Sequence, residues 1–135
     1  MPKVEFDAAL APLLASDSRY SRGAYYFVRE ALVQAQTLLR RTGEATPRHV
    51  SPEELLEGIR RHALEEFGPM ACTVFEDWGI RSCEDFGEIV FNMIQHRILA
   101  KQDSDNREDF KRGYDFKDAF RRPFTPDRRS LGVIR

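Results

Sequence analysis

The stretch that decides the predicted fold is Trp78-Gly79-Ile80-Arg81-Ser82-Cys83-Glu84-Asp85-Phe86-Gly87-Glu88-Ile89-Val90-Phe91-Asn92-Met93-Ile94. A helix is expected to end at Trp78, because Gly79 can adopt the left-handed conformation that closes helices. Ser82 can then cap a second helix, and Asp85, three residues later, can complete a weak capping box. The apolar residues of this second helix recur at helical spacing: Phe86, Ile89, Val90, Met93 and Ile94. The stretch therefore predicts a loose helix-turn-helix, with the only tryptophan of the chain at the joint.

The predicted helix that precedes this pair has the clearest boundaries in the chain. Ser51 is expected at its N-cap, Pro52 at the first helical position and Glu54 at the third, where it completes a capping box. Gly68 should end the helix, because glycine closes helices readily, and Pro69 follows it. A short helix from Pro69 to Trp78 then leads into the helix-turn-helix.

Two more helices are expected nearer the N-terminus. Apolar residues follow the helical pattern over residues 24–39, with Ser21 as a plausible cap and Gly43 as a plausible stop. Residues 6–14 also carry apolar side chains at near-helical spacing, but Pro12 argues against a long helix there. We expect a short and poorly bounded first helix.

The segment after residue 98 has two readings. Residues 99–102 and 107–111 could pair as short strands around a turn at Asp103–Asn106, since that composition favours turns. A helix-turn-helix followed by such a hairpin is the plan of a winged-helix domain. The alternative is an open helical bundle in which residues 99–110 form an irregular loop.

Length and composition support one small helical domain. The chain has 135 residues, of which 41% are apolar and ten are phenylalanine, so an aromatic-rich core is expected. The predicted fold is mainly α, with about five helices around one core in residues 1–124. Residues 125–135 are polar and basic without periodicity, which predicts a flexible tail.

Charge and cysteine content restrict the classes of function. A net charge of −1 removes the general electrostatic argument for binding nucleic acid or an acidic membrane. No run of about 18 apolar residues could span a membrane. Cys72 and Cys83 fit no metal or redox motif and are expected as reduced thiols, which indicates a cytoplasmic protein.

Three sets of residues could carry chemistry, and each has a more ordinary interpretation. His62 and Glu65 are three residues apart on a helix, but the order is reversed from that of di-metal bundles and no second copy exists. The oxygen-rich turn around Asp103 fails the calcium-loop pattern. Cys83 lies at a helix start, although Glu84 and Asp85 would oppose a thiolate there. We predict no catalytic residue, metal or cofactor.

Charge also argues against DNA binding by the helix-turn-helix. The second helix of such a motif enters the major groove, yet here it opens with Glu84, Asp85 and Glu88, which would repel phosphates. The basic residues gather instead at the C-terminus: Arg121, Arg122, Arg128, Arg129 and Arg135. Contact with RNA or a ribosome through these arginines is the alternative function. The simpler interpretation is that these arginines only keep the end of the chain in solvent.

The preferred function is a non-enzymatic module that binds an unknown protein partner. The candidate surface combines the acidic stretch with an aromatic C-terminal segment: Glu84, Asp85, Glu88, Tyr114, Phe116 and Phe120. Burial of these aromatics against the body of the protein, with no exposed apolar patch left, would remove support for docking there.

Several runs of sequence resemble one family of proteins. They are Ala24–Leu32, His49–Arg60, Phe67–Ala71, Trp78–Ile80, Glu84–Asn92 and Asp109–Phe116. Together they are similar to a small family of uncharacterised bacterial proteins of planctomycete and verrucomicrobial genomes, from about Tyr20 to Phe124. The resemblance implies a bacterial cytoplasmic protein and carries no known activity or catalytic residue.

Overall fold

The structure is a computed structural model that describes residues 3–41, 50–99, 107–111 and 113–124. Its helical elements are, in chain order, α1 (Lys3–Ser16), α2 (Arg22–Arg41), α3 (Pro52–Phe67), the 3₁₀ turn η1 (Gly68–Met70), α4 (Ala71–Trp78), α5 (Cys83–Gln95), α6 (Arg107–Lys111), the π-helical turn η2 (Lys117–Arg121) and the 3₁₀ turn η3 (Arg122–Phe124). No strand occurs in these residues, so the predicted mainly helical fold is confirmed.

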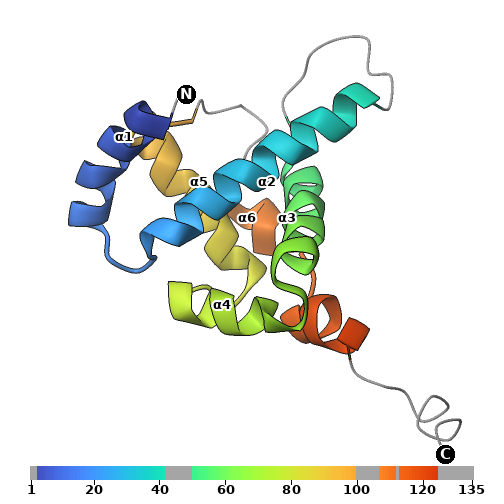
Figure 1. The fold of residues 1–135 in the computed structure, drawn as a ribbon. Helices are drawn as coiled ribbons and strands as arrows, with labels where there is room; N and C mark the ends of the chain where they lie inside the picture. The colour runs from blue at the N-terminus through green and yellow to red at the C-terminus, as the bar shows by residue number, and fades with distance from the viewer. Residues whose placement is uncertain (1–2, 42–49, 100–106, 112, 125–135) are drawn as a thin grey trace, which may run out of the picture.

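The α2 helix lies across the middle of the molecule, with α1 on one side and α3 on the other, and α5 crosses behind it (Figure 1). It contacts α3, α4 and α5. The α4 helix runs beneath them, and the C-terminal turns pack beside it (Figure 1). Because every helix presents apolar side chains to this arrangement, the buried residues from Phe6 to Phe120 form one continuous core.

Aromatic rings fill the centre of this core, as the ten phenylalanines predicted. Phe75 is fully buried, and its ring centroid lies 5.2–5.6 Å from the rings of four phenylalanines: Phe27, Phe86, Phe116 and Phe120. Most of these pairs are edge-to-face, an arrangement that aromatic rings favour. Elements far apart in the sequence therefore meet around one side chain.

The boundaries of α3 agree with the prediction. Ser51 accepts a hydrogen bond from the backbone N–H of Glu54 at 3.2 Å, and the Glu54 carboxylate accepts one from the N–H of Ser51 at 2.9 Å. This is the predicted capping box, with Pro52 at the first helical position. Gly68 ends the helix with a positive φ of 52°.

The first helix is longer than predicted. The α1 helix spans Lys3–Ser16 and continues through Pro12. Proline removes one backbone hydrogen bond from a helix interior. Here Phe6, Leu10 and Leu13 are almost completely buried, and this burial along one helical face offsets the loss.

The predicted wing is wrong where the structure describes it. Residues 107–111 form the helix α6 instead of a strand, and residues 100–106 lie outside the described residues. Phe110 is buried against α5, and a Cβ atom added at Gly87 would lie only 2.9 Å from its Cβ atom. Gly87 thus allows Phe110 to approach α5 closely, and the single apolar residue of this segment gives no periodicity that could have predicted its conformation.

Candidate functional site

The turn between α4 and α5 is closed by Gly79, as predicted. Its φ is 89°, and the N–H groups of Gly79 and Ile80 donate to the carbonyls of Glu76 and Phe75 at 3.1 and 2.8 Å. This pair of bonds is the Schellman motif of helix ends. A Cβ atom at Gly79 would lie 2.3 Å from the carbonyl oxygen of Arg19, so the α1–α2 connection also requires glycine there.

Asp85, one of the predicted partner-binding residues, is engaged inside this turn. Its carboxylate accepts hydrogen bonds from the backbone N–H groups of Arg81 and Ser82 at 2.8 and 3.2 Å. It also accepts a 2.6 Å bond from the hydroxyl of Tyr20, which is buried. Burial and this bond raise the pKa of Tyr20 far above its usual value. Asp85 therefore joins the α4–α5 turn to the start of α2.

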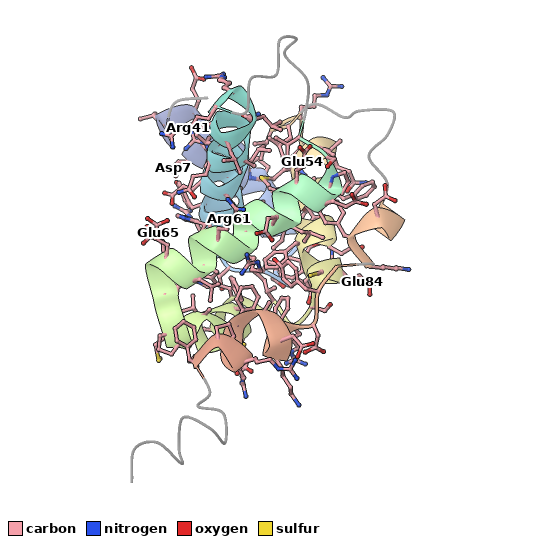
Figure 2. The ribbon with its side chains drawn as sticks, turned by 90° about the vertical axis from the view of Figure 1, so that its right-hand side faces the viewer. Asp7, Arg41, Glu54, Arg61, Glu65 and Glu84 are labelled. Carbon is pink, nitrogen blue, oxygen red and sulfur yellow. The ribbon has the colours of Figure 1, made fainter. Side chains whose placement is uncertain are left out.

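The other two acidic residues have different surroundings. Glu88 lies 3.6 Å from the guanidinium of Arg19, which also binds Asp17 at 2.7 Å. The hydrogen bonds from Arg19 lower the pKa of Asp17 to about 2. Glu84 is more than half exposed, 3.9 Å from Lys111, and in Figure 2 it lies on the opposite side of the view from Glu65. Of the three predicted acidic contacts, Glu84 is the one that faces solvent most openly.

The predicted aromatic residues turn inward. Phe120 is completely buried, and its ring lies 5.2 Å from Phe75 and 5.6 Å from Tyr114. Tyr114 and Phe116 are partly buried against the core, and the Tyr114 hydroxyl donates a 2.7 Å hydrogen bond to the carbonyl of Leu56. Burial raises the pKa of Tyr114 well above its ordinary value. These side chains hold the C-terminal segment to the body and leave little aromatic surface for a partner.

A groove remains where this segment meets α4, and we call it the C-terminal groove. Its volume is about 590 Å³. It is lined by residues of α4, the α4–α5 turn and the C-terminal segment: Cys72, Glu76, Ile80, Arg81, Ser82, Tyr114, Asp115, Phe116, Lys117 and Arg121. Two of the predicted site residues, Tyr114 and Phe116, therefore line a concave surface.

The basic side chains at this groove have fewer hydrogen-bond and ion-pair partners than the acidic side chains have. Glu76 lies 3.5 Å from Arg121, and the Asp115 carboxylate accepts the N–H groups of Lys117 and Asp118 at 2.8 and 3.3 Å. Arg81 and the ammonium of Lys117 are exposed and form no ion pair with any residue that the structure describes. The groove lining therefore carries three basic side chains against two acidic ones, and the partly buried Phe116 provides an apolar floor.

The two cysteines lie beneath the C-terminal segment. The Cys83 thiol donates to the carbonyl of Tyr114 at 3.4 Å, and the Cys72 thiol contacts the carbonyl of Phe116 at 3.9 Å. Burial raises the pKa of Cys83 to about 11. Because a nucleophilic cysteine needs a lowered pKa, Cys83 is unsuited to that role despite its place at a helix start.

His62 and Glu65, the candidate metal-binding pair, do not form a joint site. His62 is buried, stacks on Phe27, and lies 3.0 and 3.1 Å from Gln34 and Glu30, as expected of a hydrogen-bonded core histidine. Glu65, three residues on, is exposed. In the described ranges no three histidine, cysteine or acidic residues gather as a metal site. Asp103 and its turn lie outside those ranges.

The predicted nucleic-acid residues are only partly described. Arg121 lies 3.5 Å from Glu76, and Arg122 lies 3.4 Å from Asp118, so both face carboxylates. Arg128, Arg129 and Arg135 lie outside the described residues. Within the described part of the chain, no helix is long and apolar enough to cross a membrane.

No protein-family model matches the chain, and comparisons with curated proteins and with solved structures find no match. The resemblance to uncharacterised bacterial proteins stays a prediction. Sequence reasoning missed Arg81 and Lys117 as members of one surface. They lie far apart in the chain, and only the packing of the C-terminal segment beside α4 brings them to the same groove.

Proposed function

We propose that this protein is a non-enzymatic binding module of the bacterial cytoplasm that receives a short acidic segment of a partner protein in the C-terminal groove. One observation supports this most: Arg81 and Lys117 are exposed, form no ion pair with any described residue, and line the same groove as Phe116, which is only partly buried and forms an apolar floor. A carboxylate of the partner would meet these cations, and an apolar side chain beside it would cover the floor.

The burial of Tyr114 and Phe120 changes the proposed surface. Neither ring is free to act as an exposed anchor, so the partner would contact the outer face of the segment that they hold in place. Glu84 and Asp85 are not part of the proposed binding surface, because Asp85 is hydrogen-bonded inside the turn and neither residue lines the groove.

The alternative, RNA or ribosome contact through the C-terminal arginines, has weaker support. The carboxylates beside Arg121 and Arg122 reduce the positive potential that phosphates would meet. It remains a proposal for the arginines of residues 125–135.

A pull-down with matched charge variants tests the proposal. The tagged wild type, an Arg81→Glu/Lys117→Glu variant and an Arg22→Glu/Arg40→Glu variant would be exposed to the same lysate at low and high salt. Arg22 and Arg40 are exposed and lie outside the groove, so the net charge changes equally. A partner protein retained by the wild type and the control, but lost from the groove variant, supports the proposal.

Two other results contradict it. A partner that both charge variants retain would bind elsewhere on the molecule. RNA or ribosomal proteins that both variants retain at low salt, and that are lost at high salt and on deletion of residues 125–135, would favour the arginine alternative, since binding to phosphates weakens steeply with salt.

A further inference from the structure

A second groove runs between α2 and α3, and we call it the α2–α3 groove. Its volume is about 720 Å³. Residues of both helices line it: Gln34, Ala35, Thr37, Leu38, Leu39, Arg41, Glu53, Glu54, Glu57, Gly58, Arg61 and Glu65. Figure 2 shows Arg61 between Glu54 and Glu65 along α3, with Arg41 beyond them on α2.

The floor of this groove is apolar. The two helices approach closely at Gly58, where an added Cβ atom would lie 3.2 Å from the Cβ atom of Ala35. Leu38 is 41% exposed, and Leu39 is partly buried. The groove thus offers apolar surface that the described residues do not cover.

The rim of the groove carries an excess of negative charge. Four carboxylates line it against two guanidinium groups. Glu57 is held by Arg60 and Arg61 at 2.6 and 3.0 Å, whereas Glu53 and Glu65 are exposed and form no ion pair with another described residue. An occupant should therefore bring basic and apolar side chains together.

Residues 125–135 of the same chain have this composition. They contain Arg128, Arg129 and Arg135 with a single acidic residue, and three apolar residues, Leu131, Val133 and Ile134. Residues 42–49, which connect α2 to α3, contain no leucine, isoleucine, valine or aromatic residue. The connection is therefore poorly suited to cover Leu38, while the C-terminal residues are well suited.

The position of the last described residues allows this contact. The π-helical turn η2 packs against α3 and against η1, which directly follows α3, and η3 then ends at Phe124. Eleven further residues can span at most roughly 36 Å when extended. The 16 residues of α3 measure about 24 Å. The tail is long enough to run from the end of α3 along the groove.

We infer that residues 125–135 bind in the α2–α3 groove of their own chain, with arginines against Glu53 and Glu65 and apolar side chains over Leu38. This contact is independent of the partner proposed for the C-terminal groove. It would hold the basic tail on the molecule, so that a nucleic acid must compete for those arginines.

A paramagnetic label on the tail of the full chain tests this inference. Ser130→Cys places a nitroxide between Arg129 and Leu131 without removing a charge, and the native thiols are buried. We expect line broadening of the backbone amides of Leu38, Gly58 and Arg61 in the NMR spectrum. The broadening should not change on dilution, because the contact is within one chain.

A charge exchange identifies the residues responsible. Glu53→Lys/Glu65→Lys should reduce the broadening by severalfold, and adding Arg128→Glu/Arg129→Glu to that variant should restore it. Glu66→Lys, on the exposed face of the same helix and outside the groove, serves as the control and should have no effect.

Three outcomes would overturn the inference. Broadening confined to the C-terminal groove, or absent from the whole folded body, would show that the tail does not bind between α2 and α3. Broadening that disappears on dilution would assign the groove to the tail of a second copy. An equal effect of the Glu53/Glu65 and Glu66 variants would leave the groove carboxylates without a specific role.

Discussion

Asp85 and Glu84 are neighbours in one acidic stretch, yet the structure gives them opposite roles. The Asp85 carboxylate accepts three hydrogen bonds, whereas Glu84 is exposed and 3.9 Å from its nearest cation. The capping box predicted the bond to Ser82, but the bond to Tyr20 could not be predicted, because Tyr20 lies in the distant α1–α2 connection.

We therefore expect unequal effects of alanine at these two positions. Asp85→Ala should lower the free energy of unfolding by about 2–3 kcal/mol, since it leaves the Tyr20 hydroxyl and two helix-terminal N–H groups without their acceptor. Glu84→Ala should change it by less than about 0.5 kcal/mol. Urea unfolding of both variants measures the difference, and equal losses would contradict the assigned roles.

Because folding lowers the pKa of Asp17, the stability of the protein should depend on pH. Hydrogen bonds from Arg19 lower it from 3.8 to about 2, so the folded state favours the carboxylate. The stabilisation is complete at pH values above the pKa of Asp17 in the unfolded state. It is lost as the pH falls through the pKa of Asp17 in the folded state. At neutral pH, Asp17→Asn should be less stable than the wild type by about 1 kcal/mol, a small value because Arg19 is half exposed.

The difference between the wild type and the Asp17→Asn variant should shrink as the pH falls from 3.8 through about 2, as followed by urea unfolding at several pH values. Asp77→Asn removes an exposed carboxylate without an ion pair to any described residue, and it should follow the wild type throughout. A difference that persists unchanged at pH 2 would show that Asp17 acts through packing and not through its charge.

At the scale of elements, the C-terminal segment from Gly113 to Phe124 behaves as part of the core. Phe120 is fully buried among aromatic rings, whereas Phe124 is 45% exposed. The same segment covers both cysteines with its backbone carbonyls. Loss of its anchor should therefore weaken the fold and expose the thiols together.

Phe120→Ala should lower the free energy of unfolding by about 3–4 kcal/mol, because it removes a buried ring and leaves a cavity beside Phe75. It should also accelerate labelling of Cys72 and Cys83 by a thiol reagent under native conditions. Phe124→Ala should change both quantities little. Unchanged labelling in the Phe120 variant would mean that the segment does not protect the thiols.

The short helix α6 illustrates how one element can depend on another. Its residues show no decisive periodicity, and the predicted strand at residues 107–111 is wrong. Phe110 rests on α5 because Gly87 lacks a side chain at the contact. The long helices, by contrast, have several apolar positions each, and sequence periodicity located them without knowledge of their neighbours.

At the scale of the whole molecule, one core joins all the described helices. Trp78 is partly buried within 5.6–6.3 Å of the rings of Phe27, Phe67 and Phe75, which belong to three different helices. A change anywhere in this core should therefore affect the environment of the indole. The predicted single domain of residues 1–124 can be tested through this residue.

We expect one cooperative unfolding transition for the full chain. Tryptophan fluorescence, which reports on the core around Trp78, and far-ultraviolet circular dichroism, which reports on all helices, should give the same midpoint and slope in urea. Two separate midpoints would divide the molecule into independently folding parts and contradict the single-domain prediction.

The sequence by itself determined the helical class, the capping of α3, the turn at Gly79 and the aromatic character of the core. These features depend on local spacing, on caps and on glycine conformation, all of which operate within a few residues. The tertiary structure alone decided that α6 is helical, that Asp85 also bonds the Tyr20 hydroxyl and that Tyr114 bonds the carbonyl of Leu56. It also brought Arg81 and Lys117 to one groove, because contacts between distant segments depend on how the helices pack and leave no periodic signal in the chain.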